Sequence, residues 1–309
     1  MLHRVTIRLT APLGTPVVSG TLFGHLCWAM VDLRGEEALA DWLTAMETGR
    51  RPPFLLSDAF PAGFLPRPLM PPRWPEGDPP LERATKWKKA RKAVLVRRED
   101  FLELRKGAPE AAWAEAAADA SPPEPEEHRH AHNRIDRIRN TTPESAGIWF
   151  VDDLWYDGRD GRDRLDVYVD TDLDAALLRD LFTLVGENGY GRDITHGRGF
   201  FAVEELAPDG GLVAFEGNRL VSLSRGCLTD NMREPRYRRT THYGKLAIRM
   251  NALTGRPWKK PILLTLPGAS FRPADDGPFG RLLAGVHLDR PEIRFNAWHL
   301  AIPYREDAS

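Results

Sequence analysis

The chain has 309 residues, of which 42% are apolar, so it can bury the core of one large domain or of two ordinary ones. Its formal charge of −1 at pH 7 excludes a basic field over the whole protein, so affinity for nucleic acid would have to come from local charge. Cys27 and Cys227 fit neither a disulfide framework nor a zinc spacing, which favours a cytoplasmic protein.

The N-terminal part is expected to alternate strands and helices. Apolar and polar residues alternate over 1–12, which predicts an opening strand and not a signal peptide. A helix capped by Ser19 or Thr21 should follow, because apolar residues recur there at helical spacing. Glu36–Thr48 repeats that pattern, and 52–61 reads as a strand bounded by prolines. No apolar run reaches membrane-spanning length.

The composition changes in the middle of the chain. Arg83–Arg98 carries eight basic residues and no acidic one, and 121–127 is an acidic linker that contains prolines. We therefore place a domain boundary near residue 125, which gives an N-terminal domain of 1–125 with a basic insertion and a C-terminal domain of 126–309.

The second half is expected to start with strands at 148–156 and 164–169. A helix over Leu173–Val185, capped by Asp172 and ended by Gly186, should come next. Helices do not alternate regularly with buried strands, so the predicted class is α+β, with two ferredoxin-like (RRM-like) domains built on antiparallel sheets. The remaining strands are expected at 200–206, Arg219–Ser224, Pro261–Leu266 and Trp298–Ile302.

A glycine-rich loop, GYGRDITHGRGFF, lies between that helix and the next strand. Glycines expose free amides that can bind an anion, and Arg192 and Arg198 add fork-shaped donors for phosphate. The order helix, loop, strand excludes a dinucleotide-binding fingerprint. A merely flexible connection is the alternative, but the arginines inside the loop favour RNA phosphate. The candidate RNA-binding residues here are Gly189, Tyr190, Gly191, Arg192, His196, Gly197 and Arg198.

This loop, as the pattern G-h-G-x₅-G-h-G after the last helix of a ferredoxin-like domain, resembles the RAMP superfamily of CRISPR RNA-binding proteins. Other segments, in order along most of the chain, narrow the resemblance to subunit four of the type III-A (Csm) effector complex. They are SGTLFGHLCWAM (19–30), PFLLSDAFP with FLPRPLMPP (53–72), KWKKARKAVLVRREDFLEL (86–104), HNRIDRIRNTTPESAGIWFVDDLWY (132–156) and KKPILLTLPGASF (259–271).

The resemblance implies a non-catalytic RNA-binding subunit for antiviral defence. It implies that the chain caps the repeat-derived tag at the five-prime end of the crRNA, docks onto the large palm-domain subunit and contacts a backbone RAMP subunit. It also implies that the segment around HNRIDR is a thumb that marks the tag–guide boundary. We expect no cofactor, no metal and no membrane contact.

Three basic patches agree with RNA binding: Arg83–Arg98, His128–Arg139 and Arg225–Lys260. Aromatic residues interleave with the basic residues of the third patch, as in surfaces that bind single-stranded RNA, although each patch by itself could be a solvated surface. The further candidate RNA-binding residues are Ser19 in the first helix, Lys88, Lys89 and Arg91 in the first patch, His132, Asn133, Arg137 and Thr142 in and after the second, and Lys245 in the third.

Several of these candidates have a structural alternative. Asn133 can pair with a base edge or stabilise a turn, and Arg137 can reach a phosphate or pair with Asp136. Thr142 can donate to phosphate or start a strand. The helix that carries the basic residues around Trp87 can face RNA or a protein.

Two enzymatic alternatives remain open. A metal-independent endoribonuclease that processes repeat RNA would use a histidine as general base or acid, with His25, His132 and His196 as candidates. A backbone subunit that cuts target RNA would use a loop aspartate and a metal, with Asp58 as the candidate. The order of the motifs and the lack of a carboxylate cluster disfavour the second alternative.

Overall fold

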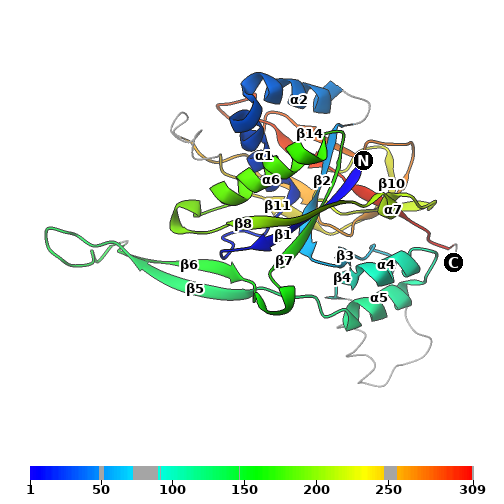
Figure 1. The fold of residues 1–309 in the computed structure, drawn as a ribbon, viewed down its shortest axis with the longest axis horizontal. Coiled ribbons are helices and arrows are strands. Elements are labelled where there is room, and N and C mark those ends of the chain that lie inside the picture. The colour runs from blue at the N-terminus through cyan, green and yellow to red at the C-terminus, as the bar shows by residue number, and fades with distance from the viewer. Residues whose placement is uncertain (49–51, 72–89, 91, 146, 247–255, 308–309) are drawn as a thin grey trace.

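The computed structural model describes residues 1–48, 52–71, 90, 92–145, 147–246 and 256–307. A four-stranded antiparallel sheet, in the order β2-β7-β1-β8, forms its centre (Figure 1). Among the described helices, none is long and apolar enough to cross a membrane. The elements of the central unit are β1 (Leu2–Leu9), α1 (Ser19–Arg34), α2 (Glu36–Thr48), β2 (Phe54–Pro61), β7 (Arg164–Thr171), α6 (Ala175–Asn188) and β8 (Phe201–Pro208).

The central unit follows the chain order of a ferredoxin-like domain. Taken along the chain, β1, α1, β2, β7, α6 and β8 give a βαββαβ unit, and β1 lies in the sheet between β7 and β8. Apolar residues alternate in β1, so Val5 and Ile7 face the helices. The predicted class, α+β with antiparallel sheets, is confirmed.

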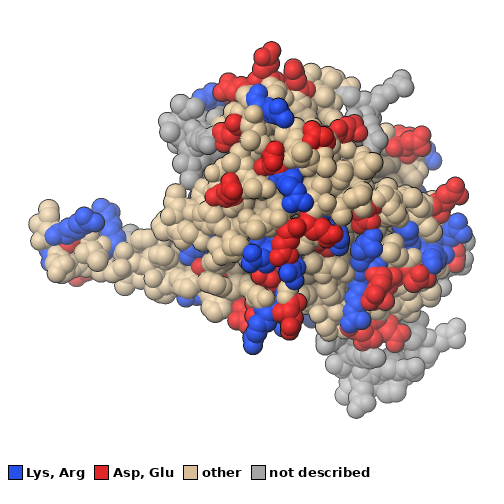
Figure 2. Space-filling view, in the orientation of Figure 1, with Lys and Arg blue, Asp and Glu red and all other residues tan. Residues whose placement is uncertain are grey.

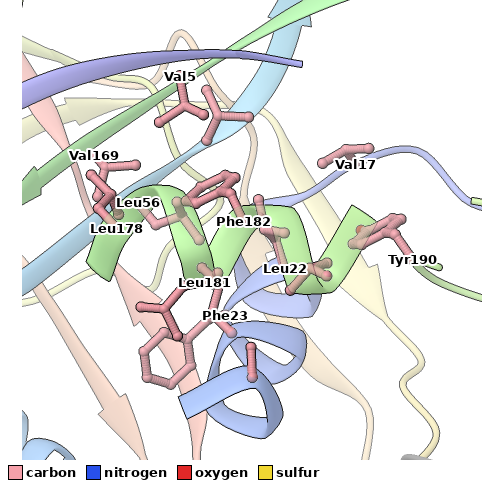
Figure 3. Close-up of a cluster of buried hydrophobic side chains, with 14 of the residues drawn as sticks. Val5, Val17, Leu22, Phe23, Leu56, Val169, Leu178, Leu181, Phe182 and Tyr190 are labelled. Atoms are coloured by element: carbon pink, nitrogen blue, oxygen red, sulfur yellow. The ribbon is translucent and has the colours of Figure 1, made fainter. Parts of the chain in front are cut away.

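Helices α1 and α6 cover one face of this sheet. Figure 3 shows Leu22 and Phe23 of α1 and Leu181 and Phe182 of α6 in the same apolar cluster as the sheet residues. Leu22, Leu181 and Phe182 are buried because both helices present their apolar stripes to the sheet. The core holds the two helices fixed, and the glycine-rich loop begins where α6 ends.

A second sheet, in the order β10-β13-β9-β16, packs against the other face. Tyr168 of β7 is buried there with Val221 and Ile302, so the central sheet is covered on both faces. The two sheets are consistent with the predicted pair of ferredoxin-like domains. The elements after β8 are α7 (Gly210–Val213), β9 (Arg219–Ser222), β10 (Met232–Arg236), β11 (Arg239–His242), β12 (Ile262–Thr265), β13 (Ser270–Pro273), β14 (Gly280–Leu283), β15 (Phe295–Trp298) and β16 (Ala301–Tyr304).

The predicted boundary near residue 125 is wrong, because it would separate β1 and β2 from β7 and β8, which share one sheet. The segment between β2 and β7 is an insertion into the ferredoxin-like unit, and its unusual composition belongs to the insertion. The chain leaves the central unit after β2 and returns to it at β7, so residues 1–125 do not form a unit of their own. The insertion carries β3 (Phe64–Pro66), β4 (Leu95–Arg97), α4 (Arg98–Leu104), α5 (Glu110–Asp119), β5 (Glu126–Asn133), β6 (Ile148–Trp155) and η1 (Arg159–Gly161).

Strands β5 and β6 form a hairpin that projects away from the body, and we call this hairpin with its connecting residues 134–147 the arm (Figure 1). All eight residues of β5 pair with β6 in unbroken antiparallel register. The arm therefore holds its own shape by its ladder of backbone hydrogen bonds, and its position depends on the contacts at its foot.

Some predicted helix and strand ends differ from the structure. Val18 and not Ser19 is the N-cap of α1, and α6 is capped by Asp174, whose carboxylate accepts from the backbone N–H of Leu177 at 2.9 Å. Helix α6 continues past Gly186 to Asn188, and its C-cap is Gly189, whose φ is 84°. The segment 298–302, expected to be one strand, contains the end of β15 and the start of β16, because the strand is interrupted at His299 and Leu300.

Candidate nucleic-acid interface

The glycine-rich loop, 189–200, is packed against the body on one side and exposed at its tip. Tyr190 is completely buried, and its hydroxyl donates to the carbonyl of Pro16 and accepts from the N–H of Val18, each at 3.0 Å. Burial raises the pKa of Tyr190, so the hydroxyl keeps its proton. Tyr190 is therefore a fixed support for the segment before α1, and its prediction as an RNA-binding residue is wrong because its side chain is not accessible.

The glycines of this loop allow close packing. Gly199 has a φ of 80°, and a Cβ there would meet the Tyr190 carbonyl at 2.0 Å. Gly191 has a φ of 81°, and its N–H donates to Nε2 of His25 at 3.0 Å. These glycines let two stretches of backbone touch. The amide of Gly191 thus has a protein partner, and so is not a free donor for phosphate.

Arg198 is buried with Asp153 of β6, with side chains 7% and 3% exposed. Its Nη2 donates to one carboxylate oxygen at 2.8 Å, and its Nε donates to the other. The hydrogen bond to Asp153 raises the pKa of Arg198. Because this bidentate pair uses the guanidinium inside the protein, the expectation that Arg198 grips RNA phosphate is wrong.

Arg192 is exposed, yet it also contacts the foot of the arm. Its Nε donates to the carbonyl of Gly14, and its Nη2 donates to the carbonyl of Asp152. Leu13 and Leu154 exchange two backbone hydrogen bonds of 2.9 Å at the same place. The glycine-rich loop and the segment before α1 together fix the arm to the central unit.

The arm exposes flat rings and basic side chains. Trp149 and Trp155 are 45% and 42% exposed, and Trp149 stacks on His132 with ring centroids 5.7 Å apart. Arg137, which has no partner among the described residues, is exposed in the connection between the strands. Figure 2 shows Lys and Arg side chains gathered at the outer end of the arm. The other exposed apolar residues of the arm are Ile135, Ile138, Ile148 and Phe150.

A cavity of about 300 Å³ is lined by residues of β2, of the insertion and of the segment that follows β9. We call it the Asp58 cavity. Its wall includes Tyr156, which directly follows β6, and the segment 16–18 that Tyr190 supports. The cavity therefore begins at the foot of the arm. Arg225 and Arg238 also line it.

Asp58 is placed in the cavity by an irregularity of β2. The pairing of β2 with β7 shifts between Leu56 and Ala59, and such a bulge re-aims side chains. The buried carboxylate accepts from the N–H of Ser19 at 2.9 Å and from Nε of Arg225 at 2.9 Å. Burial raises the pKa of Asp58, and Arg225 opposes the rise. Asp58 orients Arg225 and the start of α1, and no group of three or more metal-binding side chains exists among the described residues.

Arg238 is the unpaired cation of this cavity. Burial lowers its pKa, and its guanidinium has no hydrogen-bond or ionic partner in the described part of the chain. Arg225 has one partner for Nε, and its terminal amino groups have none in that same part. Two guanidinium groups against one carboxylate leave the cavity net positive, which suits an anion such as an RNA phosphate.

Some of the remaining predicted residues lie on or beside the arm, and the others lie elsewhere. His132, Asn133, Arg137 and Thr142 are on the arm, and His196 meets them at the loop tip, with its ring 6.2 Å from that of His132. Asn133 donates to Thr142 at 3.5 Å, and Asp136 accepts from the backbone of Ile138 and not from Arg137. Ser19 is buried, so its hydroxyl is not accessible to RNA. Lys88, Lys89 and Arg91 lie outside the described residues, and the ammonium of Lys245 lies 4.2 Å from the ring centroid of Trp258.

Sequence reasoning missed the residues that the Asp58 cavity brings together. Arg225 and Arg238 lie in the third basic patch, so composition pointed to their region but not to them. Tyr156 carried no signal, because its importance comes from the place where β6 ends. Of the histidines considered for catalysis, His25 accepts from Gly191 and is kept neutral by burial, which lowers its pKa to about 4.

No family model and no curated protein matches the chain. Among solved structures, it matches a chain of the Csm1–Csm4 cassette in complex with pppApA, with a TM-score of 0.58, 17% identity and coverage of 100% of this chain and 99% of that one. It also matches a chain of the Csm3–Csm4 subcomplex of the type III-A CRISPR-Cas interference complex, with a TM-score of 0.59, 11% identity and coverage of 98% and 99%. A third match, from the cassette with cA4, has a TM-score of 0.58, 16% identity and full coverage of both chains.

Csm4 is the subunit common to these complexes. At these identities, all 17% or lower, the similarity establishes a shared fold over the whole chain. The resemblance expected from the sequence motifs is thereby confirmed at the level of the fold.

Proposed function

We propose that the chain is a non-catalytic, cytoplasmic RNA-binding subunit of a type III CRISPR interference complex. In this role it caps the repeat-derived tag at the five-prime end of the crRNA. Its protein partners are a large palm-domain subunit of the Csm1 kind and a backbone subunit of the Csm3 kind, because the solved chains that share its fold were found with Csm1 and with Csm3.

The observation that carries the proposal is the continuity between the arm and the Asp58 cavity. Trp149 and Trp155 of β6 are exposed, and Tyr156, the next residue along the chain, is part of the cavity wall. Arg238 of the same wall has no counter-ion among the described residues. Single-stranded RNA needs flat rings for its bases and cations for its phosphates, and both are found along this path. We therefore expect RNA to bind along the arm and the Asp58 cavity. The glycine-rich loop stabilises both through its contacts with the foot of the arm and with the segment 16–18.

A binding and cleavage experiment on the full chain tests this function. A labelled RNA that carries the repeat-derived tag is titrated with the protein at several salt concentrations, with and without Mg²⁺, beside an RNA with a scrambled tag. We expect tighter binding of the tag RNA, a steep loss of affinity with salt and intact RNA throughout. Cleavage that disappears in His196→Ala would favour the processing endoribonuclease, and equal affinity for both RNAs would contradict a tag-capping role.

A further inference from the structure

Residues 10–18, which connect β1 to α1, join the arm to the Asp58 cavity, and we call them the β1–α1 segment. They contain no helix or strand, yet Leu13 and Val17 are 0% and 4% exposed and belong to the main apolar cluster. Figure 3 shows Val17 in this cluster. Pro12 and Pro16 fix two of the backbone φ angles. We therefore expect the segment to move as a stiff unit.

One end of the β1–α1 segment is fixed to the foot of the arm. Leu13 and Leu154 exchange two backbone hydrogen bonds of 2.9 Å, and both side chains pack in the main apolar cluster. Arg192 of the glycine-rich loop reinforces this contact, because its Nε donates to the carbonyl of Gly14 and its Nη2 donates to that of Asp152. A displacement of the foot of the arm would therefore also displace residues 13 and 14.

The other end of the β1–α1 segment forms part of the cavity wall. The carbonyl of Val17 accepts from the N–H of Ala59 at 3.0 Å, and Ala59 directly follows Asp58 in β2. The N–H of Ser19, the first residue of α1, donates to the Asp58 carboxylate at 2.9 Å, and the same carboxylate accepts from Arg225. This end of the segment therefore helps to determine where Asp58 and Arg225 lie.

The glycine-rich loop packs along the middle of the β1–α1 segment. The hydroxyl of Tyr190 accepts from the N–H of Val18 and donates to the carbonyl of Pro16, each at 3.0 Å. A Cβ at Gly191 would meet Oγ1 of Thr15 at 2.1 Å, so the loop and the segment are in close contact there. Each residue from 13 to 19 thus contacts the arm, the loop or the cavity wall, which leaves the segment little freedom to absorb a displacement at one end.

We propose that the β1–α1 segment couples the arm to the Asp58 cavity mechanically, so that a change in the contacts of Leu154 changes the hydrogen bonds of Ser19 and Ala59. The coupling acts in both directions, because two sites that share a coupling free energy affect each other equally. The inference goes beyond the proposed function, since it concerns how the chain transmits a displacement and not what binds at either site. A partner that repositions the arm would also reposition Asp58 and Arg225.

Amide hydrogen exchange of the full chain tests the coupling. Leu154→Pro removes the N–H that donates to the carbonyl of Leu13, and it removes no hydrogen bond between β5 and β6, because that N–H faces away from β5. We expect the amides of Ser19 and Ala59 to exchange about tenfold faster in this variant. The amide of Ser222, which is hydrogen-bonded within the second half of the chain, should change less than about twofold.

Phe150→Pro is the matched control. Phe150 lies on the same edge of β6 as Leu154, because alternate residues of an antiparallel strand direct their N–H groups to the same side. Its side chain is 63% exposed, so this substitution should not change the exchange of Ser19 or Ala59. Leu154→Ala keeps both backbone hydrogen bonds with Leu13, so it should have a smaller effect than Leu154→Pro and measures what the loss of the side chain contributes.

The opposite direction is tested at the cavity. Asp58→Asn replaces the charged acceptor of the Ser19 N–H by a neutral one, which weakens this hydrogen bond. We expect the amides of Leu13 and Leu154, at the far end of the β1–α1 segment, to exchange several-fold faster as a result.

The inference is wrong if Leu154→Pro leaves the exchange of Ser19 and Ala59 unchanged, or if it accelerates Ser222 to the same extent. It is equally wrong if Asp58→Asn leaves the amides at the foot of the arm unchanged, and this result decides alone if Leu154→Pro does not fold. None of these measurements involves RNA, so a negative result would leave the proposed function standing.

Discussion

Arg198 of the glycine-rich loop and Asp153 of the arm form a bidentate ion pair that is almost completely buried, with Nη2 and Oδ2 2.8 Å apart. The pair joins two segments that are 45 residues apart in the sequence. It assigns the loop a different role from the one that its composition indicates, because the loop's guanidinium holds the arm and not a ligand.

Arg198→Ala should destabilise the protein by about 3–5 kcal/mol, because it leaves the carboxylate of Asp153 buried without its main partner. Chemical denaturation of the full chain measures the loss, and limited proteolysis should show faster cleavage at the arm. Lys106→Ala is the matched control, since it removes an exposed ion pair with Glu103 and should have little effect. An unchanged stability combined with a smaller salt dependence of RNA binding would mean that Arg198 contacts phosphate after all.

Tyr190→Phe should cost about 1–3 kcal/mol, because the N–H of Val18 and the carbonyl of Pro16 lose the hydroxyl that satisfies both. The midpoint of thermal unfolding reports the change. Tyr243→Phe is a suitable comparison, because Tyr243 is 69% exposed and should tolerate the loss of its hydroxyl. Equal midpoints for the two variants would show that Tyr190 supports the cavity wall by its ring alone.

Arg238→Ala should weaken the binding of tag RNA and lower the salt slope of its affinity by about one, if the guanidinium contacts one phosphate. Its folding should be unaffected, because Arg238 has no side-chain partner within the described residues. Arg233→Ala, an exposed residue of β10 away from the cavity wall, serves as the control and should leave the slope unchanged. If the salt slope falls equally in both variants, the two arginines contribute only general electrostatic attraction, and Arg238 does not contact a phosphate in the cavity.

The stability of the protein should fall as the pH drops from about 6.5 to about 4, because burial lowers the pKa of His299 from 6.5 to about 4. Burial favours the neutral imidazole in the folded state, where Nε2 lies 3.1 Å from the carbonyl oxygen of Cys227 and Nδ1 lies 2.7 Å from the hydroxyl oxygen of Ser222. The unfolded chain binds the proton at a higher pH, so the contribution, on the order of 3 kcal/mol, is present above pH 6.5 and lost below it.

Denaturation of the wild type and of His299→Gln across that range checks this prediction. The variant should lose stability at neutral pH but show a shallower decline with acid, since it lacks the titrating group. The same acid dependence in both proteins would assign the decline to the other buried histidines, His25 and His242.

Local patterns predicted much of the secondary structure. The helix at Glu36–Thr48 begins and ends where its apolar periodicity does, and the strands at 148–155 and 164–171 follow runs of β-branched and aromatic residues. The predicted helix ends were wrong where a tertiary contact competes with a local sequence preference. Ser19 would be a good N-cap by itself, but its N–H is bonded to Asp58, and Val18 takes the cap position.

The amino-acid order alone determined the class of fold, the family resemblance and the general regions of positive charge, because periodicity, glycine placement and composition are properties of neighbouring residues. Only the tertiary structure decided which cations are available. Arg198 and Arg238 have the same chemistry and both lie in basic segments, yet one is neutralised by Asp153 and the other has no counter-ion within the described residues. That difference depends on which side chains meet across long distances in the chain, and the sequence does not encode such meetings in any local pattern.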